Sequence, residues 1–400
     1  MNIFIIPLIV LFQLIFIFVV VFIDRSKKRV VTKYPFISFI VPTYNDADTL
    51  GDTIDSIYKS YSHKLEVFVV NDCSSDNTDE VMAKQMQKHK NIFYIKNSTN
   101  KGKTASINSV FAKTKGELVY IVDSDIILNR TVINDTLARL ESNPKVGAVS
   151  SRCVTKNTKI FSKLLTLEYS MISAFQKVLS LKSALGLWGA SVCIKRSVFE
   201  KAGLLSLNTI TEDVDLALKI GELGYKVEEN TFPVETSDLK TFKSWTEQKI
   251  RWAAGSVQAY FKHYKYVLKH SIFMLFFVLN LVIFVLSIFS LQPTINLISS
   301  LYLFYELNAF LAFSSFLLIL FHSSLFISLL EYLFFMLLGP FFVIPYLYYG
   351  FPNLFKKPML FLLIFPFTLI YLPIFMFVSF FGFIYGGYKF FTLQEGSRGW

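Results

Sequence analysis

Cysteine is scarce in this sequence, and the few that are present form no site. The three cysteines, Cys73, Cys153 and Cys193, are widely spaced and do not follow the spacing of metal ligands. We therefore predict free thiols in a reducing compartment, where disulfides are rare, and assign them no role beyond packing.

The glycine motifs of two common nucleotide-binding folds are also missing. No Gly-x-Gly-x-x-Gly follows any predicted strand, so a dinucleotide-binding dehydrogenase lacks its fingerprint. Gly102-Lys103-Thr104 resembles the end of a P-loop, but Asn97 stands where that motif requires glycine. This excludes a P-loop NTPase, and a bound diphosphate must be held in another way.

Charged side chains are almost absent from four long segments. Residues 3–23 and 358–388 contain none, 271–321 contain only Glu306, and 323–355 contain only Glu331. The hydrophobic content of 53% and the mean hydropathy of +0.47 agree with a membrane protein. Because about twenty apolar residues cross the hydrocarbon core of a bilayer, the sequence predicts several membrane-spanning helices. We place them near 3–23, 272–291, 299–321, 324–348 and 359–388.

The charges that flank the first apolar segment predict the orientation of the chain. Residues 25–33 carry five lysines and arginines, and such a basic flank stays on the cytoplasmic side. No small-residue cleavage site precedes this flank, which favours an uncleaved anchor over a signal peptide. We therefore expect an anchor over 1–24 with the N-terminus outside the plasma membrane, a cytoplasmic catalytic domain over 25–270, and a transmembrane region of about four helical segments over 271–400.

Three further observations concern the membrane. The net charge of +11 suggests nucleic acid, but much of the charge lies beside the apolar segments, so we expect membrane lipids and no nucleic acid as partners. Residues 160–181 and 258–270 have the pattern of interfacial helices, although packing against the domain itself fits them nearly as well. Lys356 and Lys357 would emerge outside if every segment crossed once, so we expect a later segment to be re-entrant or interfacial. The candidates are 358–388 and the span that contains Pro340 and Pro345.

The charged middle part alternates between strand and helix patterns. Four apolar, β-branched runs at 36–41, 66–70, 92–95 and 118–122 are separated by helix-length segments. This order predicts a Rossmann-like, mainly parallel α/β sheet, in which ligands bind beyond the carboxyl ends of the strands. Polar residues stand at those ends: Thr43, Tyr44 and Asn45 after the first run, Asn71 and Asp72 after the second, and Asp123 and Asp125 after the fourth.

Asp123 and Asp125 give one way to hold a diphosphate. Side chains at i and i+2 of an extended segment share a face, so two carboxylates at a strand end can bind a hard divalent cation, Mg²⁺ or Mn²⁺. Such a cation also binds phosphate oxygens and neutralises a departing nucleoside diphosphate. A lone Asp-x-Asp is weak evidence, because solvated aspartates in a turn give the same pattern.

Together the motifs resemble the family-2 glycosyltransferases, in particular the processive polysaccharide synthases. The resemblance covers roughly residues 36–260 and departs from the family pattern at Asn71 and Cys73, where the family usually has aspartate and glycine. It rests on Val41-Pro42-Thr43-Tyr44-Asn45, Val70-Asn71-Asp72-Cys73-Ser74, Asn100-Lys101-Gly102-Lys103, Asp123-Ser124-Asp125, Thr211-Glu212-Asp213 and Gln248-Lys249-Ile250-Arg251-Trp252.

The resemblance implies a GT-A-type fold in front of an α-helical transmembrane bundle, and it implies roles for single residues. Asp213 is the expected catalytic base, with Glu212 as the alternative. The other assignments are nucleotide binding by Thr43, Tyr44, Asn45, Asp72, Lys101, Lys103 and Asp123, metal binding by Asp123 and Asp125, and acceptor and diphosphate contacts by Gln248, Arg251, Trp252, Trp188 and Gly189. The chemistry of the residues agrees, since arginine grips diphosphate oxygens and an indole face stacks against a sugar ring.

Several residues are similar to the poly-N-acetylglucosamine synthase branch of the family. They include Glu168, Tyr169 and Trp245, whereas Trp188-Gly189 stands where that branch usually has Ser-Gly. The acceptor pocket is therefore expected to differ. The resemblance favours UDP-GlcNAc as the donor over UDP-Glc.

We expect a membrane-embedded, inverting hexosyltransferase that elongates a β-linked polysaccharide from a UDP-sugar and aids its translocation, alone or with a partner subunit. Two alternatives stay open. A glycolipid synthase would add a single sugar to ceramide or polyprenyl phosphate and differs in the size of its product. A non-catalytic export or scaffold subunit predicts lost carboxylates, yet Asp72, Asp123, Asp125 and Asp213 are all present.

Overall fold

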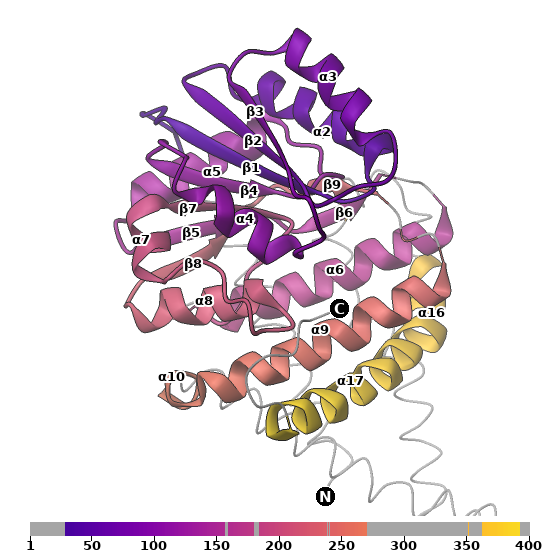
Figure 1. Ribbon diagram of the computed structural model, residues 1–400. Coiled ribbons are helices and arrows are strands. Elements are labelled where there is room, and N and C mark those ends of the chain that lie inside the picture. Colours follow the sequence, from indigo (N-terminus) through magenta and orange to yellow (C-terminus); the bar gives the residue numbers. More distant parts are fainter. Residues whose placement is uncertain are drawn as a thin grey trace, which may run out of the picture.

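The computed structural model describes residues 29–156, 159–179, 184–237, 239, 241–269, 351 and 362–392 (Figure 1). The elements alternate at first between strand and helix and end in a series of helices. Their bounds are β1 Ile37–Thr43, α2 Ala47–Ser60, β2 Leu65–Asn71, α3 Thr78–Lys88, β3 Ile92–Lys96, α4 Lys103–Phe111, β4 Leu118–Val122, α5 Arg130–Ser142, β5 Val146–Ser150, β6 Cys153–Thr155, α6 Ile160–Leu179, β7 Ser191–Lys195, α7 Arg196–Lys201, α8 Glu212–Glu222, β8 Lys226–Glu229, β9 Val234–Thr236, α9 Phe242–Lys262, α10 Tyr264–Lys269, α16 Ile364–Pro366, the π-helical turn η4 Phe367–Tyr371 and α17 Leu372–Thr392.

The main sheet has seven strands in the order β3-β2-β1-β4-β7-β5-β8. The four strands predicted from the sequence are β1 to β4, which pair in parallel and start and end within two residues of their predicted bounds. Strand β7 runs antiparallel to both of its neighbours, β4 and β5. The predicted mainly parallel α/β fold is therefore confirmed, with one reversed strand inside the sheet.

Both faces of the sheet are buried under helices. All residues of β1 and β2 are buried, which explains their continuous apolar character. Because alternate side chains of a strand point to opposite faces, Phe39 packs in the cluster with α2, α3 and α5, whereas Ile40 packs in the cluster with α4, α7 and α8. Residues at the carboxyl ends of β1, β2 and β4 are left at one edge of the sheet, where the candidate active site lies.

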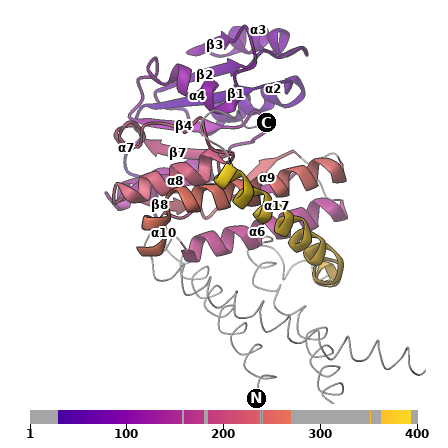
Figure 2. The same ribbon diagram turned by 60° about the horizontal axis from the view of Figure 1, so that its bottom comes forward.

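Helices α6, α9 and α17 lie side by side at one side of the sheet domain (Figures 1 and 2). Helix α17 packs closely on α9. A Cβ atom placed on Gly386 would lie 2.5 Å from the backbone oxygen of Ala254, and one on Gly382 would lie 2.7 Å from Cβ of Ala253. Small residues therefore permit the contact between segments that are far apart in the chain.

The membrane predictions concern mostly residues outside those described. The predicted spans near 3–23, 272–291, 299–321 and 324–348 lie there, and the last, near 359–388, is described from residue 362 onward as α16, η4 and α17. Among the described residues, no helix combines the length and apolarity needed to cross a bilayer. The segment 160–181 largely forms α6, whose Leu165 and Tyr169 are buried in the domain.

Candidate active site

Asp72, at the end of β2, organises the loop that precedes α4. Its carboxylate accepts hydrogen bonds from Asn97 Nδ2 at 2.8 Å, from Lys101 N at 2.9 Å and from Gly102 N at 2.7 Å. Burial raises the pKa of Asp72, but these donors outweigh it and the net pKa is lowered. The ionised carboxylate thus fixes the loop from which Lys103 projects. Its role in nucleotide binding remains a prediction.

Lys103 joins three of the sequence motifs. Its Nζ lies 2.5 Å from Asp123 Oδ1 and 3.8 Å from Glu212 Oε1. Burial lowers the pKa of Lys103, but the charges of Asp123 and Glu212 raise it overall, so the amine stays charged. Burial raises the pKa of Asp123, and the nearby charges of Asp125 and Glu212 act in the same direction. A charged lysine among these carboxylates is placed to meet an incoming phosphate group.

Asp213, the second residue of α8, lies against the backbone of Gly189. Its Oδ2 accepts from Gly189 N at 3.2 Å, and its Oδ1 accepts from Val214 N at 2.8 Å. A Cβ atom at position 189 would lie 2.9 Å from Cβ of Asp213, so only glycine permits this approach. Burial, assisted by the charge of Glu212, raises the pKa of Asp213 to about 6. A carboxylate tuned close to neutral pH suits a general base.

Three aromatic side chains pack beside this pair and are called here the aromatic triad: Tyr169, Trp188 and Trp252. The ring centroids of Trp188 and Trp252 are 6.0 Å apart and edge to face, and Tyr169 lies 5.6 Å from Trp188 and 5.9 Å from Trp252. Within the described part of the chain, the buried Trp188 Nε1 has no hydrogen-bond partner. Aromatic faces with an available N–H donor suit a sugar ring with its hydroxyl groups.

The predicted Gln248, Arg251 and Trp252 all come from α9. Gln248 Oε1 accepts from Lys249 Nζ at 2.8 Å. Arg251 is exposed, and its charge acts to lower the pKa of Asp213, so it lies within electrostatic reach of the candidate base. The structure therefore brings the Gln-x-x-Arg-Trp helix to the same site as the Thr-Glu-Asp motif.

The turn after β1 lies at the same edge of the sheet. Thr43 is buried, and in the described structure its Oγ1 has no hydrogen-bond partner. Tyr44 is 48% exposed, which leaves its ring free to meet a ligand. Asn45 has a φ of 57° and its Oδ1 accepts from Ser75 N at 2.9 Å, so it ties the turns after β1 and β2 together.

Asp125 is held by residues at and after the end of β9. Its Oδ2 accepts from Thr236 Oγ1 at 2.6 Å and from Ser237 Oγ at 2.7 Å. In the described residues, no three His, Cys, Asp or Glu side chains gather where they could hold a metal ion. Two adjacent carboxylates, one of them oriented by an outer layer of hydroxyl donors, nevertheless fit a hard cation that takes its remaining ligands from phosphate and water.

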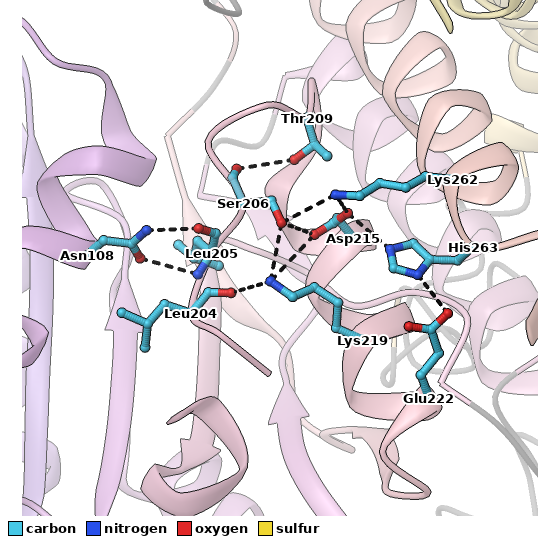
Figure 3. Close-up of polar contacts among 10 residues, drawn as sticks. All are labelled: Asn108, Leu204, Leu205, Ser206, Thr209, Asp215, Lys219, Glu222, Lys262 and His263. Carbon is cyan, nitrogen blue, oxygen red and sulfur yellow. Dashed lines mark hydrogen bonds and ion pairs between the residues drawn. The ribbon is translucent and has the colours of Figure 1, made fainter. Parts of the chain in front are cut away.

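A second polar cluster ties α8 to the end of α9 (Figure 3). The fully buried Asp215 accepts from Lys262 Nζ at 2.7 Å and from Ser206 Oγ at 2.6 Å, and lies 3.2 Å from His263 Nε2. His263 Nδ1 lies 2.9 Å from Glu222. Because Asp213 lies in the first turn of the same helix, this cluster fixes the candidate base relative to α9.

Sequence reasoning missed several residues of the site. Asn97 was considered only as a missing glycine, Lys249 only as an unspecified position of Gln-x-x-Arg-Trp, and Ser237 not at all. A recess opens beside the base, and its wall is mostly apolar. It is lined by Lys103, Gly189, Glu212 and Asp213 together with Ile107, Ile121, Leu187, Val192, Leu205 and Leu216.

Comparison with known proteins agrees with the fold and with the motifs. Residues 38–203 match the family model of Glycosyl transferase family 2. The chain is 26% identical over 223 residues to the poly-beta-1,6-N-acetyl-D-glucosamine synthase of Staphylococcus aureus (strain MSSA476) and 27% identical to that of Staphylococcus epidermidis. Each match covers 55% of this chain and 54% of the relative, so the similarity spans about half the length of these curated relatives.

A solved structure supports the fold independently. The mannosyltransferase PcManGT from Pyrobaculum calidifontis, determined in complex with GDP-Man and Mn²⁺, superposes with a TM-score of 0.52 at 23% identity. The match covers 65% of this chain and 74% of the mannosyltransferase. At this identity it supports the GT-A-like architecture of the described domain.

Proposed function

We propose that this chain, whose residues 38–203 form a family-2 glycosyltransferase domain of the synthase type, elongates a β-linked polysaccharide from a UDP-sugar, with inversion at the anomeric carbon. UDP-GlcNAc is the favoured donor, since the curated relatives are named as N-acetylglucosamine polymer synthases. The observation that carries the proposal is that Asp213 and Lys103 line one recess beside the aromatic triad, and that Lys103 also pairs with Asp123.

The proposed reaction is a single displacement. Asp213 takes the proton of an acceptor hydroxyl while that oxygen bonds to the anomeric carbon of the donor sugar. The bond between this carbon and the diphosphate breaks on the opposite face, so an α-linked donor gives a β-linked product and UDP. The proton on Asp213 then passes to water.

Charge on the leaving group must be balanced as the bond breaks. Lys103 is placed to pair with the diphosphate, and the exposed Arg251 has the geometry to grip its oxygens with two hydrogen bonds. Asp123 and Asp125 would hold Mg²⁺ or Mn²⁺, which supplies Lewis-acid neutralisation of the diphosphate when bound. Trp252 and Trp188 receive the acceptor sugar at the aromatic triad.

The cellular setting is part of the same proposal. We place the catalytic domain on the cytoplasmic side of the plasma membrane, with the apolar segments on either side of it in the bilayer and aiding export of the polymer. The basic flank of residues 25–33 and the scarcity of charge in 3–23 and 271–388 support this setting.

Radiolabel transfer from a panel of UDP-sugars tests the proposal. The full chain is purified in lipid nanodiscs and compared with Asp213→Asn, with Asp52→Asn on the exposed face of α2 as a matched control. We expect a large, water-soluble, labelled product from the unmodified chain and from Asp52→Asn, and a loss of at least 1000-fold in Asp213→Asn. A small product that extracts into organic solvent would instead identify a glycolipid synthase. Activity that survives in Asp213→Asn would overturn the assignment of the base.

A further inference from the structure

A buried ion pair lies directly behind the acceptor side of the site. Lys249 Nζ of α9 lies 2.5 Å from Glu168 Oε1 of α6, and both side chains are 0% exposed. Removing two charges from water is expensive, and a buried pair often adds nothing to stability that well-packed apolar side chains would not add. The pair therefore calls for an explanation other than stability.

Lys249 contacts three residues on the acceptor side. Its Nζ donates to Gln248 Oε1 at 2.8 Å and lies 4.1 Å from the ring centroid of Trp252 and 5.0 Å from that of Tyr169. One ammonium group thus sets the rotamer of the glutamine and holds two rings of the aromatic triad by cation–π contacts. Lys249 itself is buried, so it acts through these neighbours and not on a substrate.

Glu168 connects the same pair to the C-terminal part of the chain. Its Oε2 accepts from Tyr371 Oη at 2.5 Å and from Trp245 Nε1 at 3.2 Å, and Trp245 Nε1 also donates to Tyr371 Oη at 2.8 Å. Tyr371 ends η4, immediately before α17, which packs against Ile250 and Ala253 of α9 through Gly382. The C-terminal segment of η4 and α17 therefore touches α9 on both sides of Gln248.

From these contacts we propose that Glu168, Lys249 and Tyr371 form a positioning device that holds Gln248 and Trp252 in the geometry that receives the acceptor saccharide. The device also makes that geometry depend on the docking of the C-terminal helix. This inference rests on the proposed function, because it assigns the acceptor to the aromatic triad.

A variant that replaces both charges of the buried ion pair distinguishes a positioning role from a packing role. The double variant Glu168→Leu/Lys249→Met exchanges the ion pair for apolar side chains of similar size, and such exchanges commonly preserve folding. Trp245 Nε1 keeps its partner Tyr371 Oη in this variant. If the pair only packs the core, a folded double variant keeps its affinity for the acceptor. If the pair positions Gln248 and Trp252, the acceptor affinity falls although the fold survives.

The experiment uses the full chain in nanodiscs. UDP is the probe for nucleotide binding, and UDP-GlcNAc with a short β-linked N-acetylglucosamine oligosaccharide as acceptor is used for the transfer kinetics. For the double variant we expect a thermal midpoint close to that of the unmodified chain, a dissociation constant for UDP changed by less than twofold, and an acceptor KM raised at least tenfold. Tyr371→Phe removes one hydroxyl and should raise the acceptor KM about threefold, which corresponds to the net value of one hydrogen bond. Lys243→Met, on the same helix but 85% exposed, is the matched control and should change nothing.

The possible outcomes distinguish a failure of the proposed function from a failure of the positioning role. A lower kcat with unchanged KM values would mean a smaller folded fraction and would overturn the positioning role. If the double variant does not fold, Tyr371→Phe decides: an unchanged acceptor KM overturns the inference, and a raised one supports it. If the unmodified chain transfers no sugar from any donor, the proposed function is wrong. If the chain is active but substitution of Glu168, Lys249 and Tyr371 leaves the acceptor KM unchanged, this inference alone is wrong.

Discussion

At the scale of single residues, the environment of Asp213 gives it a titration that can be tested. Burial and the charge of Glu212 raise its pKa to about 6, while Val214 N, Lys103 and Arg251 act in the opposite direction. A base must be ionised, so protonation of Asp213 should remove activity as the pH falls below about 6. The raised pKa thus places the acid limb of the pH profile nearer to neutrality than an ordinary aspartate would.

Glu212→Gln provides the sharpest test of this titration. Removing the neighbouring negative charge should lower the pKa of Asp213, so the acid limb of kcat/KM should move to lower pH while activity persists. The measurement is the pH dependence of sugar transfer by both proteins from pH 4.5 to 9, a range chosen to bracket the value of about 6. An unmoved limb would refute the coupling, and complete loss of activity would indicate that Glu212 itself is the base.

Cys73 has a backbone conformation that is unfavourable for a residue with a side chain. Its φ of 68° lies in the left-handed region, which costs a residue with a side chain about 1 kcal/mol or more. Glycine adopts this conformation freely, and the family pattern has glycine at this position. We expect Cys73→Gly to leave the free energy of unfolding unchanged or to raise it by about 1 kcal/mol.

The same substitution at Cys193 is the control for Cys73→Gly. Cys193 is fully buried in β7 and its φ is not positive. Cys193→Gly should therefore destabilise the protein by roughly 1–3 kcal/mol, because it leaves a cavity and loosens a strand. Thermal unfolding of both variants provides the comparison, and a loss of stability in Cys73→Gly as large as that in Cys193→Gly would contradict the argument from backbone strain.

At the scale of elements, the docking of α17 on α9 depends on small residues. A Cβ atom on Gly386 would lie 2.5 Å from a backbone oxygen of Ala254, whereas one on Gly387 would meet nothing within 4 Å. Gly386→Ala should therefore push α17 away from α9, lower the thermal midpoint and speed proteolysis of the C-terminal helix. Gly387→Ala should be neutral or slightly stabilising, because alanine favours a helix by up to about 1 kcal/mol over glycine. Equal behaviour of the two variants would show that the close crossing is unimportant.

Short-range patterns in the sequence predicted the first four strands and the edge of the sheet at which the site lies. The strands β1 to β4 followed from apolar runs bounded by polar residues, and their carboxyl ends located Asp72 and Asp123 at one edge of the sheet. Motif matches then located Asp213 and Trp252, and the structure brings these to the same site. The reversed direction of β7 was not predicted, since no local signal in five residues reports the direction of a strand.

Contacts between distant segments account for most of what the sequence did not reveal. Tyr371 and Glu168 are 203 positions apart, and nothing in the periodicity of either segment indicates that they meet. Lys249 is likewise an ordinary lysine in the sequence and becomes informative only when its burial and its contact with Glu168 are known. Residues of this kind act through tertiary contacts, which a pattern of neighbours along the chain does not record.

At the scale of the whole molecule, α9 joins the chemistry to the predicted membrane region. One side of this helix carries Gln248, Arg251 and Trp252 toward the site, while Ile250 and Ala253 meet α17. The end of α9 is tied to α8, and so to the candidate base, through Asp215. A change in the docking of the C-terminal segment would therefore reach the acceptor side and the base by a continuous series of contacts.

The proposed topology makes a prediction that the natural cysteines can test. Cys153 and Cys193 are buried, and Cys73 is the partly exposed one of the three cysteines in the chain. If residues 25–270 are cytoplasmic, a membrane-impermeant maleimide should not label intact cells that express the protein. After the membrane is permeabilised, Cys73 should react, and Cys73→Gly should abolish that labelling.

A cysteine placed near the N-terminus completes the test. The basic flank after residues 3–23 predicts an N-terminus outside the membrane, so Cys73→Gly combined with Asn2→Cys should be labelled in intact cells. Labelling of Cys73 in intact cells would place the catalytic domain outside, where nucleotide sugars are not supplied, and would overturn the proposed setting. If neither Cys73 nor the cysteine at position 2 is labelled in intact cells, the outward N-terminus is refuted and the cytoplasmic catalytic domain still stands. The two labelling experiments are independent in this way because the two cysteines lie on opposite sides of the first apolar segment.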